Sequence, residues 1–472
     1  MVTRLLSLLY KEWSGLHQAA FLLGMSSLAA QVLALLRDRL LASTFGASTE
    51  LDIYYSAFRI PDLIYVTFAS VVSVTVLIPF ILKKKEEGGE EKVRRFLSGV
   101  STVFVGTTCL MGLFFFITMP YFSGLIAPGF TPEAKQELIL LSRILLLSPL
   151  LLGLSNFLGC ITKSYRKFFA YILSPVLYNL GIIVGIVFFY PTMGLVGLVW
   201  GVIVGAVLHM LIQLPSVYRL GLLPSFTVHI NFKEIKEVVF MSLPRTLTLA
   251  THQISLAVLV ALGSLMAVGS ITVFNLAFNL QSVPLIIIGV SYSVAAFPTL
   301  AALFSRWETK KFVGKIETAI RHIFFWSLPA MVLFIVLRAQ IVRVILGAGN
   351  FSWSDTRLVA AGLAVFVVSV VAQSFVQLFV RVYYASGRTK VPLLANIISS
   401  IGVIILAFIL IYFFKNVLVF RYFIELLLRV DNVPGTIILT LPLAYSLGLT
   451  LNAIIYWWVF RRDFGAFSPL VY

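Results

Sequence analysis

Three charged residues stand side by side within a long apolar stretch near the N-terminus. Arg37, Asp38 and Arg39 follow a run without charged residues. A charged side chain at the centre of a bilayer costs about 2.5–3.5 kcal/mol, so such residues face protein or water. A guanidinium there can bind a phosphate through paired hydrogen bonds, and we expect Arg37 to bind an anionic group. The alternative is a structural ion pair between Arg37 and Asp38.

Further charged residues follow in two other apolar stretches. Asp52, Arg59 and Asp62 lie close together in the sequence, and Arg59 and Asp62 are spaced so that they can neutralise one another on a helix. Arg245 follows a proline at the start of a later stretch. These residues are candidates for contact with an anionic solute. The alternatives are an interfacial position for Asp52 and an Arg245 side chain that extends to the membrane surface.

No enzyme motif accompanies these charges. The sequence has no His and Glu spacing or paired Cys spacing typical of metal sites, no glycine-rich phosphate loop followed by Lys and Ser or Thr, and no nucleophile elbow. We therefore predict no enzyme activity, no catalytic residue, no metal site and no cofactor.

The elements that position these residues must be membrane helices. With 60% hydrophobic and 12% charged residues the chain is far more apolar than a soluble domain. About twelve stretches are long enough, at roughly 20 residues, to cross the hydrocarbon core as helices. The expected spans are 18–44, 53–82, 96–119, 137–160, 169–190, 194–215, 236–263, 271–303, 318–340, 358–382, 391–414 and 436–460. The predicted fold is an all-α integral membrane protein.

The chain repeats itself once in the same order, at an offset of about 220 residues. Segment 125–130 returns as segment 346–351, and Pro79 returns as Pro298. Six spans per half is an even number, so both halves enter the membrane from the same side. We predict two parallel-repeat six-helix lobes around a central cavity that carries a solute. The predicted parts are an amphipathic cytoplasmic lead-in over 1–17, a first lobe over 18–218, a cytoplasmic linker over 219–235, a second lobe over 236–462 and a cytoplasmic tail over 463–472.

The net charge of +17 does not predict a nucleic-acid partner, because the basic residues lie in loops on one side of the membrane. Lys and Arg gather in alternate loops and in the tail, for example at 83–95 and 306–315. This pattern is typical of the cytoplasmic side and places both termini in the cytoplasm.

Two short segments predict packing and not chemistry. Gly197, Gly201 and Gly205 recur every four residues, which favours close approach of a neighbouring helix. Arg421, Glu425 and Arg429 share one side of a predicted helix that can lie at the outer membrane surface. The alternative for the second segment is a tethered loop with ordinary i,i+4 ion pairing.

The chain resembles the MurJ (MviN) family of lipid II flippases from about residue 18 to 462. The first half carries the resemblance in Leu36-Arg37-Asp38, Phe45-Gly46, Asp52, Ala57, Pro61 and Pro79, and the second half in Gln253, Pro284, Pro298, Gly349-Asn350-Phe351, Tyr384-Ala385, Thr389 and Pro392.

This resemblance implies a fold and a substrate. The fold is that of the multidrug/oligosaccharidyl-lipid/polysaccharide exporters, with two lobes around a V-shaped cavity that opens alternately to each side. The substrate is an undecaprenyl diphosphate that carries the peptidoglycan precursor, flipped from the inner to the outer leaflet of the bacterial cytoplasmic membrane. Membrane lipids and cell-wall synthesis proteins are the implied partners.

The chain departs from the family pattern at several places. Where the family has cavity arginines on the first, second and eighth spans, this chain has Gln31, Tyr65 and Asn279. Typical members also have fourteen spans. The predicted substrate-binding residues, from the charges and the resemblance together, are Gln31, Arg37, Asp38, Asp52, Arg59, Arg245, Gln253 and Asn279.

The departures leave two other functions open. One is an exporter of another lipid-linked oligosaccharide or an amphiphilic drug on the same fold, and the other is a membrane scaffold that transports nothing.

Asp and Glu are absent between Val238 and Leu303 and between Val391 and Phe414, so the second lobe is not expected to hold sodium through carboxylates.

Overall fold

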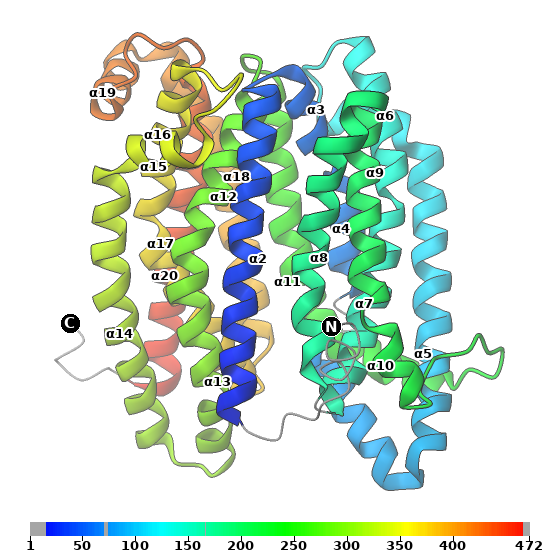
Figure 1. Cartoon of the computed structure of the whole chain (residues 1–472). Helices are drawn as coiled ribbons and strands as arrows, with labels where there is room; N and C mark the ends of the chain where they lie inside the picture. The colour runs from blue at the N-terminus through cyan, green and yellow to red at the C-terminus, as the bar shows by residue number, and fades with distance from the viewer. Residues whose placement is uncertain (1–15, 70–73, 166, 466–472) are drawn as a thin grey trace. The chain divides into compact units, whose positions relative to one another are not determined.

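The protein is built from helices. The computed structural model describes residues 16–69, 74–165 and 167–465; within these ranges almost every residue is helical and no strand occurs (Figure 1). The prediction of an all-α fold is confirmed. The predicted lead-in falls outside the described residues up to residue 15, as does the tail from residue 466.

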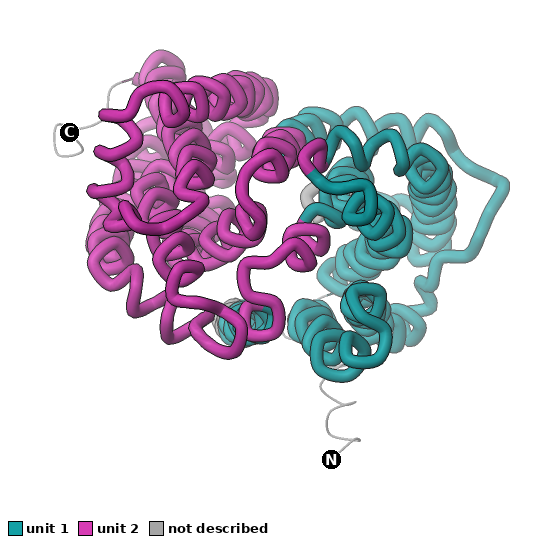
Figure 2. The backbone as a smooth tube through the Cα atoms, turned by 90° about the horizontal axis from the view of Figure 1, so that it is seen from above, with its two compact units in different colours: residues 1–41, 56–126, 130–253 teal, residues 42–55, 127–129, 254–472 magenta. Residues whose placement is uncertain are grey.

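Contacts divide the chain into two compact units (Figure 2). The first contains residues up to 41, 56–126 and 130–253, and the second contains 42–55, 127–129 and 254 onwards. Two helices, α2 (Leu16–Phe45) and α11 (Phe232–Ser264), begin in the first unit and end in the second. The short segments 42–55 and 127–129 therefore belong to the second unit although the rest of the first repeat does not.

The first unit contains, besides α2 and α11, the following elements: α4 (Arg59–Ala69), α5 (Val74–Ile126), α6 (Pro132–Leu145), α7 (Leu147–Ser164), α8 (Phe168–Val184), the π-helical turn η1 (Gly185–Phe189), α9 (Tyr190–Leu211) and α10 (Leu214–Arg219). The second unit contains most of α3 (Thr49–Ala57), then α12 (Ser270–Pro284), the π-helical turn η2 (Leu285–Val290), α13 (Ser291–Ser305), α14 (Thr309–Val336), α15 (Arg338–Leu346), α16 (Trp353–Val368), α17 (Val370–Ala385), α18 (Lys390–Asn416), α19 (Leu418–Leu428), the 3₁₀ turn η3 (Thr436–Leu439) and α20 (Thr440–Phe464).

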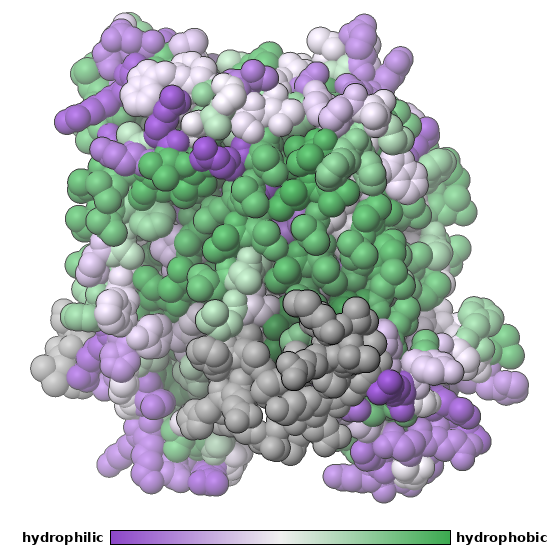
Figure 3. Space-filling view, viewed as in Figure 1, coloured by the Kyte–Doolittle hydropathy of each residue, from purple (hydrophilic) through white to green (hydrophobic). Residues whose placement is uncertain are grey.

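Many of these helices are long and apolar enough to cross a membrane. Eight described stretches meet that condition, and α16 with α17, bent by 45°, makes a ninth. Two of the eight are 51 residues long and are broken inside, at Gly88–Gly89 in α5 and at Gly194 in α9, where the backbone is not helical. Each predicted span falls on helical segments of the described residues. Figure 3 shows mostly hydrophobic side chains across the middle of the visible face and hydrophilic ones at both ends, as a membrane protein requires.

Glycines bring α8 and α9 into direct backbone contact. A Cβ atom added to Gly201 would lie 2.4 Å from the Cα atom of Gly185, and one added to Gly181 would lie 2.2 Å from the Cα atom of Gly205. The predicted close packing at Gly201 and Gly205 is confirmed. Its partners are Gly181 on α8 and Gly185 at the start of η1, which the sequence pattern on α9 did not identify.

The predicted helix around Arg421 and Glu425 is present as α19. Arg421 donates to the Glu425 carboxylate at 3.0 Å, and Thr436 donates to the same oxygen at 2.6 Å. Glu425 is buried, while Val419 on the same helix is 80% exposed. The i,i+4 ion pair of the alternative interpretation is therefore formed on a helix that presents apolar side chains outwards.

Substituting Gly201 tests the contact between α8 and α9. We expect Gly201→Ala to lower the free energy of unfolding by about 1–3 kcal/mol, because its methyl group would force the two backbones apart. Gly106→Ala on α5 is the control, since a Cβ atom there meets nothing within 4 Å. The measurement is the thermal unfolding midpoint of each variant in detergent. Equal midpoints would contradict the close packing.

Candidate functional site

Arg37 joins α2 to α8 within the first unit. Its Nε and Nη2 atoms donate to one carboxylate oxygen of Asp38, at 2.9 and 2.7 Å, and its Nη1 atom donates to the Asn179 side chain at 3.2 Å. Asn179 in turn donates to the carbonyl of Pro175 at 3.0 Å. Hydrogen bonds on two sides of the guanidinium fix its plane. The ion pair of the alternative interpretation is thus present.

The Arg37 side chain remains partly exposed. The Arg37 side chain is 20% exposed, whereas that of Asp38 is 4% exposed. A second α2 to α8 contact, from the Ser26 hydroxyl to the Ile172 carbonyl, holds the two helices together further along. The hydrogen bonds thus hold the Arg37 guanidinium in a set orientation on α2, against α8.

A second polar cluster joins α4 to α7. Asn156 donates to the Tyr65 hydroxyl oxygen at 2.6 Å. One turn earlier on α4, the charge of Arg59 acts on the Asp62 carboxylate, as the spacing of these two residues predicts. Arg59 is buried in the unit, with 9% of its surface exposed. Where the family has an arginine on this span, this chain has a neutral hydroxyl whose partner is an amide.

The remaining predicted residues of the first unit lie on α2 and α11. Gln31, Arg245 and Gln253 are each half-buried. The charge of Arg245 acts on Cys160 of α7, so this arginine lies beside the helix that also carries Asn156. The first unit thus holds six of the eight predicted residues on three helices: Gln31, Arg37, Asp38, Arg59, Arg245 and Gln253.

Asp52 lies in the second unit and caps α12. Its carboxylate accepts hydrogen bonds from the backbone N–H of Gly269 at 2.8 Å, from the backbone N–H of Thr272 at 2.7 Å and from the Thr272 hydroxyl at 2.7 Å. Asp52 is 4% exposed. A carboxylate at the first turn satisfies donors that have no partner within the helix and interacts favourably with the helix dipole.

Three glycines allow residues 42–55 to pack closely against the rest of the second unit. Gly46, Gly269 and Gly349 all have a positive φ, and a Cβ atom on any of them would lie within 2.7 Å of a carbonyl oxygen. Asn350 adds two hydrogen bonds, from its backbone N–H to Ser43 at 2.8 Å and from its side chain to Thr44 at 2.7 Å. We call Gly46, Asp52, Gly269, Gly349 and Asn350, with their partners, the clasp.

Asn279 is the other predicted residue in the second unit. It is half-buried on α12, and its backbone carbonyl accepts from the Ser282 hydroxyl at 2.6 Å. Nearby in sequence, Gln281 accepts from Gln373 of α17 at 3.2 Å, and Gln373 also donates to the Ser369 hydroxyl at 2.8 Å. The sequence analysis missed this buried glutamine pair, whose only signal was an uncharged polar residue in each of two apolar spans.

The comparisons with known proteins agree on one family. The family model described as "Lipid II flippase MurJ" matches residues 41–420. The "Probable lipid II flippase MurJ" of Buchnera aphidicola subsp. Acyrthosiphon pisum is 28% identical over 398 residues, with 83% of this chain and 77% of that protein covered. The "Lipid II flippase MurJ" of Burkholderia cenocepacia is 23% identical over 390 residues, with 80% and 74% covered.

Solved structures show the same fold. A lipid II flippase MurJ in an inward closed conformation matches with a TM-score of 0.76 at 22% identity, over 94% of this chain and 89% of that chain. An inward-facing MATE family multidrug transporter of the MOP superfamily matches with a TM-score of 0.72 at 18% identity, over 92% and 94%. The fold predicted from the resemblance, that of this exporter superfamily, is confirmed.

The role of Asp52 can be tested by removing its carboxylate. We expect Asp52→Ala to destabilise the start of α12 by about 2 kcal/mol, because three donors lose their acceptor. The measurement is hydrogen exchange of the α12 peptide by mass spectrometry. Asp355→Ala is the control, because Asp355 caps α16 of the same unit and leaves α12 untouched. Unchanged protection of α12 in Asp52→Ala would show that the carboxylate does not hold the helix.

Proposed function

The chain belongs to the MurJ family, and from this premise we propose that it flips lipid II, a polyprenyl-diphosphate-linked peptidoglycan precursor, from the inner to the outer leaflet by alternating access. The observation that carries the proposal is the family match over residues 41–420. The cationic side chains of the first unit add physical support, because a diphosphate head group needs charged or hydrogen-bonding partners within the membrane.

We assign the head group to the predicted residues of the first unit. Arg37 has the orientation and the exposure for a phosphate contact. Arg59 and Arg245 supply further positive charge, and Gln31 and Gln253 supply uncharged hydrogen-bonding groups. Asn279 is the proposed contact on the second unit. Asp38 and Asp52 act differently: Asp38 orients Arg37, and Asp52 holds α12.

The proposed transport cycle uses the two repeats. The lobes over 18–218 and 236–462, joined by the linker 219–235, tilt so that the cavity opens to either side in turn. The polyprenyl tail stays in the lipid while the head group crosses. Both termini lie in the cytoplasm, and the basic loops face the same side of the bacterial cytoplasmic membrane. Proteins of cell-wall synthesis are the proposed partners.

Replacing Arg37 tests the head-group assignment. In a strain depleted of its own lipid II flippase, we expect Arg37→Ala to abolish complementation at nearly normal protein abundance, because the cation that meets the diphosphate is lost. Arg39→Ala is the matched control, because Arg39 is a neighbouring arginine on the same helix that is not among the predicted binding residues. Lipid II on the outer face is measured in parallel with growth.

The alternatives give different results in this experiment. Loss of folded protein in Arg37→Ala would show that the ion pair with Asp38 is structural and would remove Arg37 from the site. Growth restored by the wild-type chain without exposure of lipid II on the outer face would contradict the proposed function itself. Asn179→Ala, which leaves the ion pair intact, is expected to reduce but not abolish complementation.

The driving force is a separate prediction. An inside-negative potential favours outward movement of an anionic head group by about 2.3 kcal/mol per charge per 100 mV. Because the second lobe lacks acidic residues over 238–303 and 391–414, we expect transport to respond to the membrane potential and not to sodium. The measurement is lipid II exposure under a potassium and valinomycin clamp, with choline in place of sodium. Sodium dependence at a clamped potential would overturn this prediction.

A further inference from the structure

Two polar cavities lie at one end of the first unit, beside the break in α5. The first, of about 370 Å³, is lined by Lys84, Lys92, Arg95, Phe96, Gly99, His229, Asn231, Glu234 and Ile235. The second, of about 780 Å³, is lined by Arg94, Arg95, Ser98, Tyr218, Gly221, Leu223, Ser225, Thr227 and His229. They share Arg95 and His229, so they form one continuous polar site.

The wall of this site is held in place by hydrogen bonds. The Ser98 hydroxyl accepts from the backbone N–H of Ser225 at 3.1 Å, and the Thr102 hydroxyl accepts from the backbone N–H of Thr227 at 3.2 Å. Ser98 and Thr102 are one turn apart, so the linker runs along one face of α5. Arg95 lies one turn before Ser98 on that face. The basic side chains of α5 and the linker residues 219–235 therefore form the walls of the site together.

The site carries an excess of positive charge. Four cationic side chains line it, and Glu234 is the one acidic side chain among the lining residues of the two cavities. Lys84 neutralises that carboxylate through an ion pair at 2.8 Å. Lys92 donates to the backbone carbonyl of Glu87 at 3.1 Å. An anionic ligand is therefore complementary to the site.

An apolar cavity of about 310 Å³ adjoins the polar site. Its walls are α4, α5 and α11, with Thr67, Phe68, Val100, Val103, Phe104, Thr107, Ile235, Val238, Val239, Ser242, Leu243 and Thr246 as lining residues. Ile235 lines both this cavity and the first polar one. Leu243, which is 41% exposed on α11, is one of the lining residues, so the apolar cavity is open on one side.

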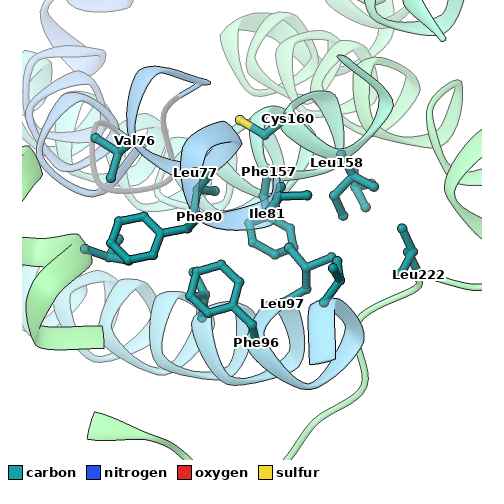
Figure 4. Close-up of a cluster of buried hydrophobic side chains, with 14 of the residues drawn as sticks. Val76, Leu77, Phe80, Ile81, Phe96, Leu97, Phe157, Leu158, Cys160 and Leu222 are labelled. Carbon is teal, nitrogen blue, oxygen red and sulfur yellow. The ribbon is translucent and has the colours of Figure 1, made fainter. Parts of the chain in front are cut away.

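A rigid core supports the polar and apolar parts together. Phe80 and Phe96, from the two arms of α5, stack with centroids 5.8 Å apart, and Phe157 of α7 is fully buried with them (Figure 4). Phe96 also lines the first polar cavity. The site is thus built on packed helices, which keeps its cations at set positions.

We propose that this site binds an anionic phospholipid of the surrounding membrane, with the phosphate in the polar cavities and part of one acyl chain in the apolar cavity. Basic pockets between membrane helices on the cytoplasmic side bind anionic lipid head groups, and the basic loops place this end on that side. The apolar continuation favours a lipid over a soluble anion. The lipid is a bound companion and not the transported molecule, so the proposal stands apart from the proposed function.

Filling the polar cavity tests the site. Gly99 lines it, and a Cβ atom on Gly99 meets nothing within 4 Å. We expect Gly99→Trp to abolish binding of phosphatidylglycerol by the full chain, measured by native mass spectrometry in detergent. Gly106→Trp is the control, because Gly106 lies on the same helix, a Cβ atom there also meets nothing within 4 Å, and Gly106 lines none of the three cavities. The two variants binding equally well would overturn the proposal.

A charge substitution gives a second test in which folding is not at risk. Arg95 forms an exposed i,i+4 ion pair with Glu91, and Arg321 forms an i,i+4 ion pair with the mostly buried Glu317 outside the site. We expect Arg95→Gln to weaken phosphatidylglycerol binding about fivefold, as loss of one cation near a lipid phosphate implies. Arg321→Gln should bind like the wild type. An equal effect of both substitutions would show general charge attraction and contradict a site.

Three competing ligands separate the sources of the anion. Phosphatidylcholine with the same acyl chains should bind at least fivefold more weakly than phosphatidylglycerol; equal binding would overturn the role of the cations. Inorganic diphosphate that displaces the lipid at the same concentration would show a soluble-anion site instead. Undecaprenyl diphosphate is the third competitor. If it displaces phosphatidylglycerol with higher affinity, and Gly99→Trp abolishes this binding of undecaprenyl diphosphate, the site belongs to the transported lipid and the proposal is overturned.

Discussion

The capping of α12 by Asp52 is the interaction on which the arrangement of the second unit depends. A buried carboxylate is stable only when its oxygens are hydrogen-bonded, and here the donors are the free backbone N–H groups at the start of a helix. The carboxylate and the backbone N–H groups therefore satisfy each other's hydrogen-bonding capacity. The result is that residues 42–55, which follow the end of α2, are part of the second unit and not of the first.

The clasp brings together several of the residues on which the sequence resemblance was based. Gly46, Asp52, Gly349 and Asn350 carry the resemblance and have no chemistry in common, yet in the structure they meet within one unit. Glycine is needed where the backbone has a positive φ and a carbonyl oxygen lies against it, since any side chain would be both strained and obstructed. Their shared property is close backbone approach.

The charges of the first unit follow a different principle. Arg37 has an anionic neighbour and an amide partner, so its burial costs less than that of an isolated cation. The basic residues near the break in α5 differ from Arg37, because they lie at the end of the helices, where water and lipid head groups compete for them.

Sequence alone determined the all-α membrane fold, the family and the close packing at Gly201, because these follow from local hydropathy, from motifs and from spacing along one helix. It also indicated that Arg59 and Asp62 interact, since their spacing sets the distance. Only the tertiary structure decided the partners of isolated polar residues. Asn179 for Arg37 and Thr272 for Asp52 lie 142 and 220 residues away, so spacing along a single helix cannot identify such partners. The cavities beside α5 depend likewise on where the linker runs, which hydropathy does not encode, because a polar segment at the membrane surface is equally soluble along many paths.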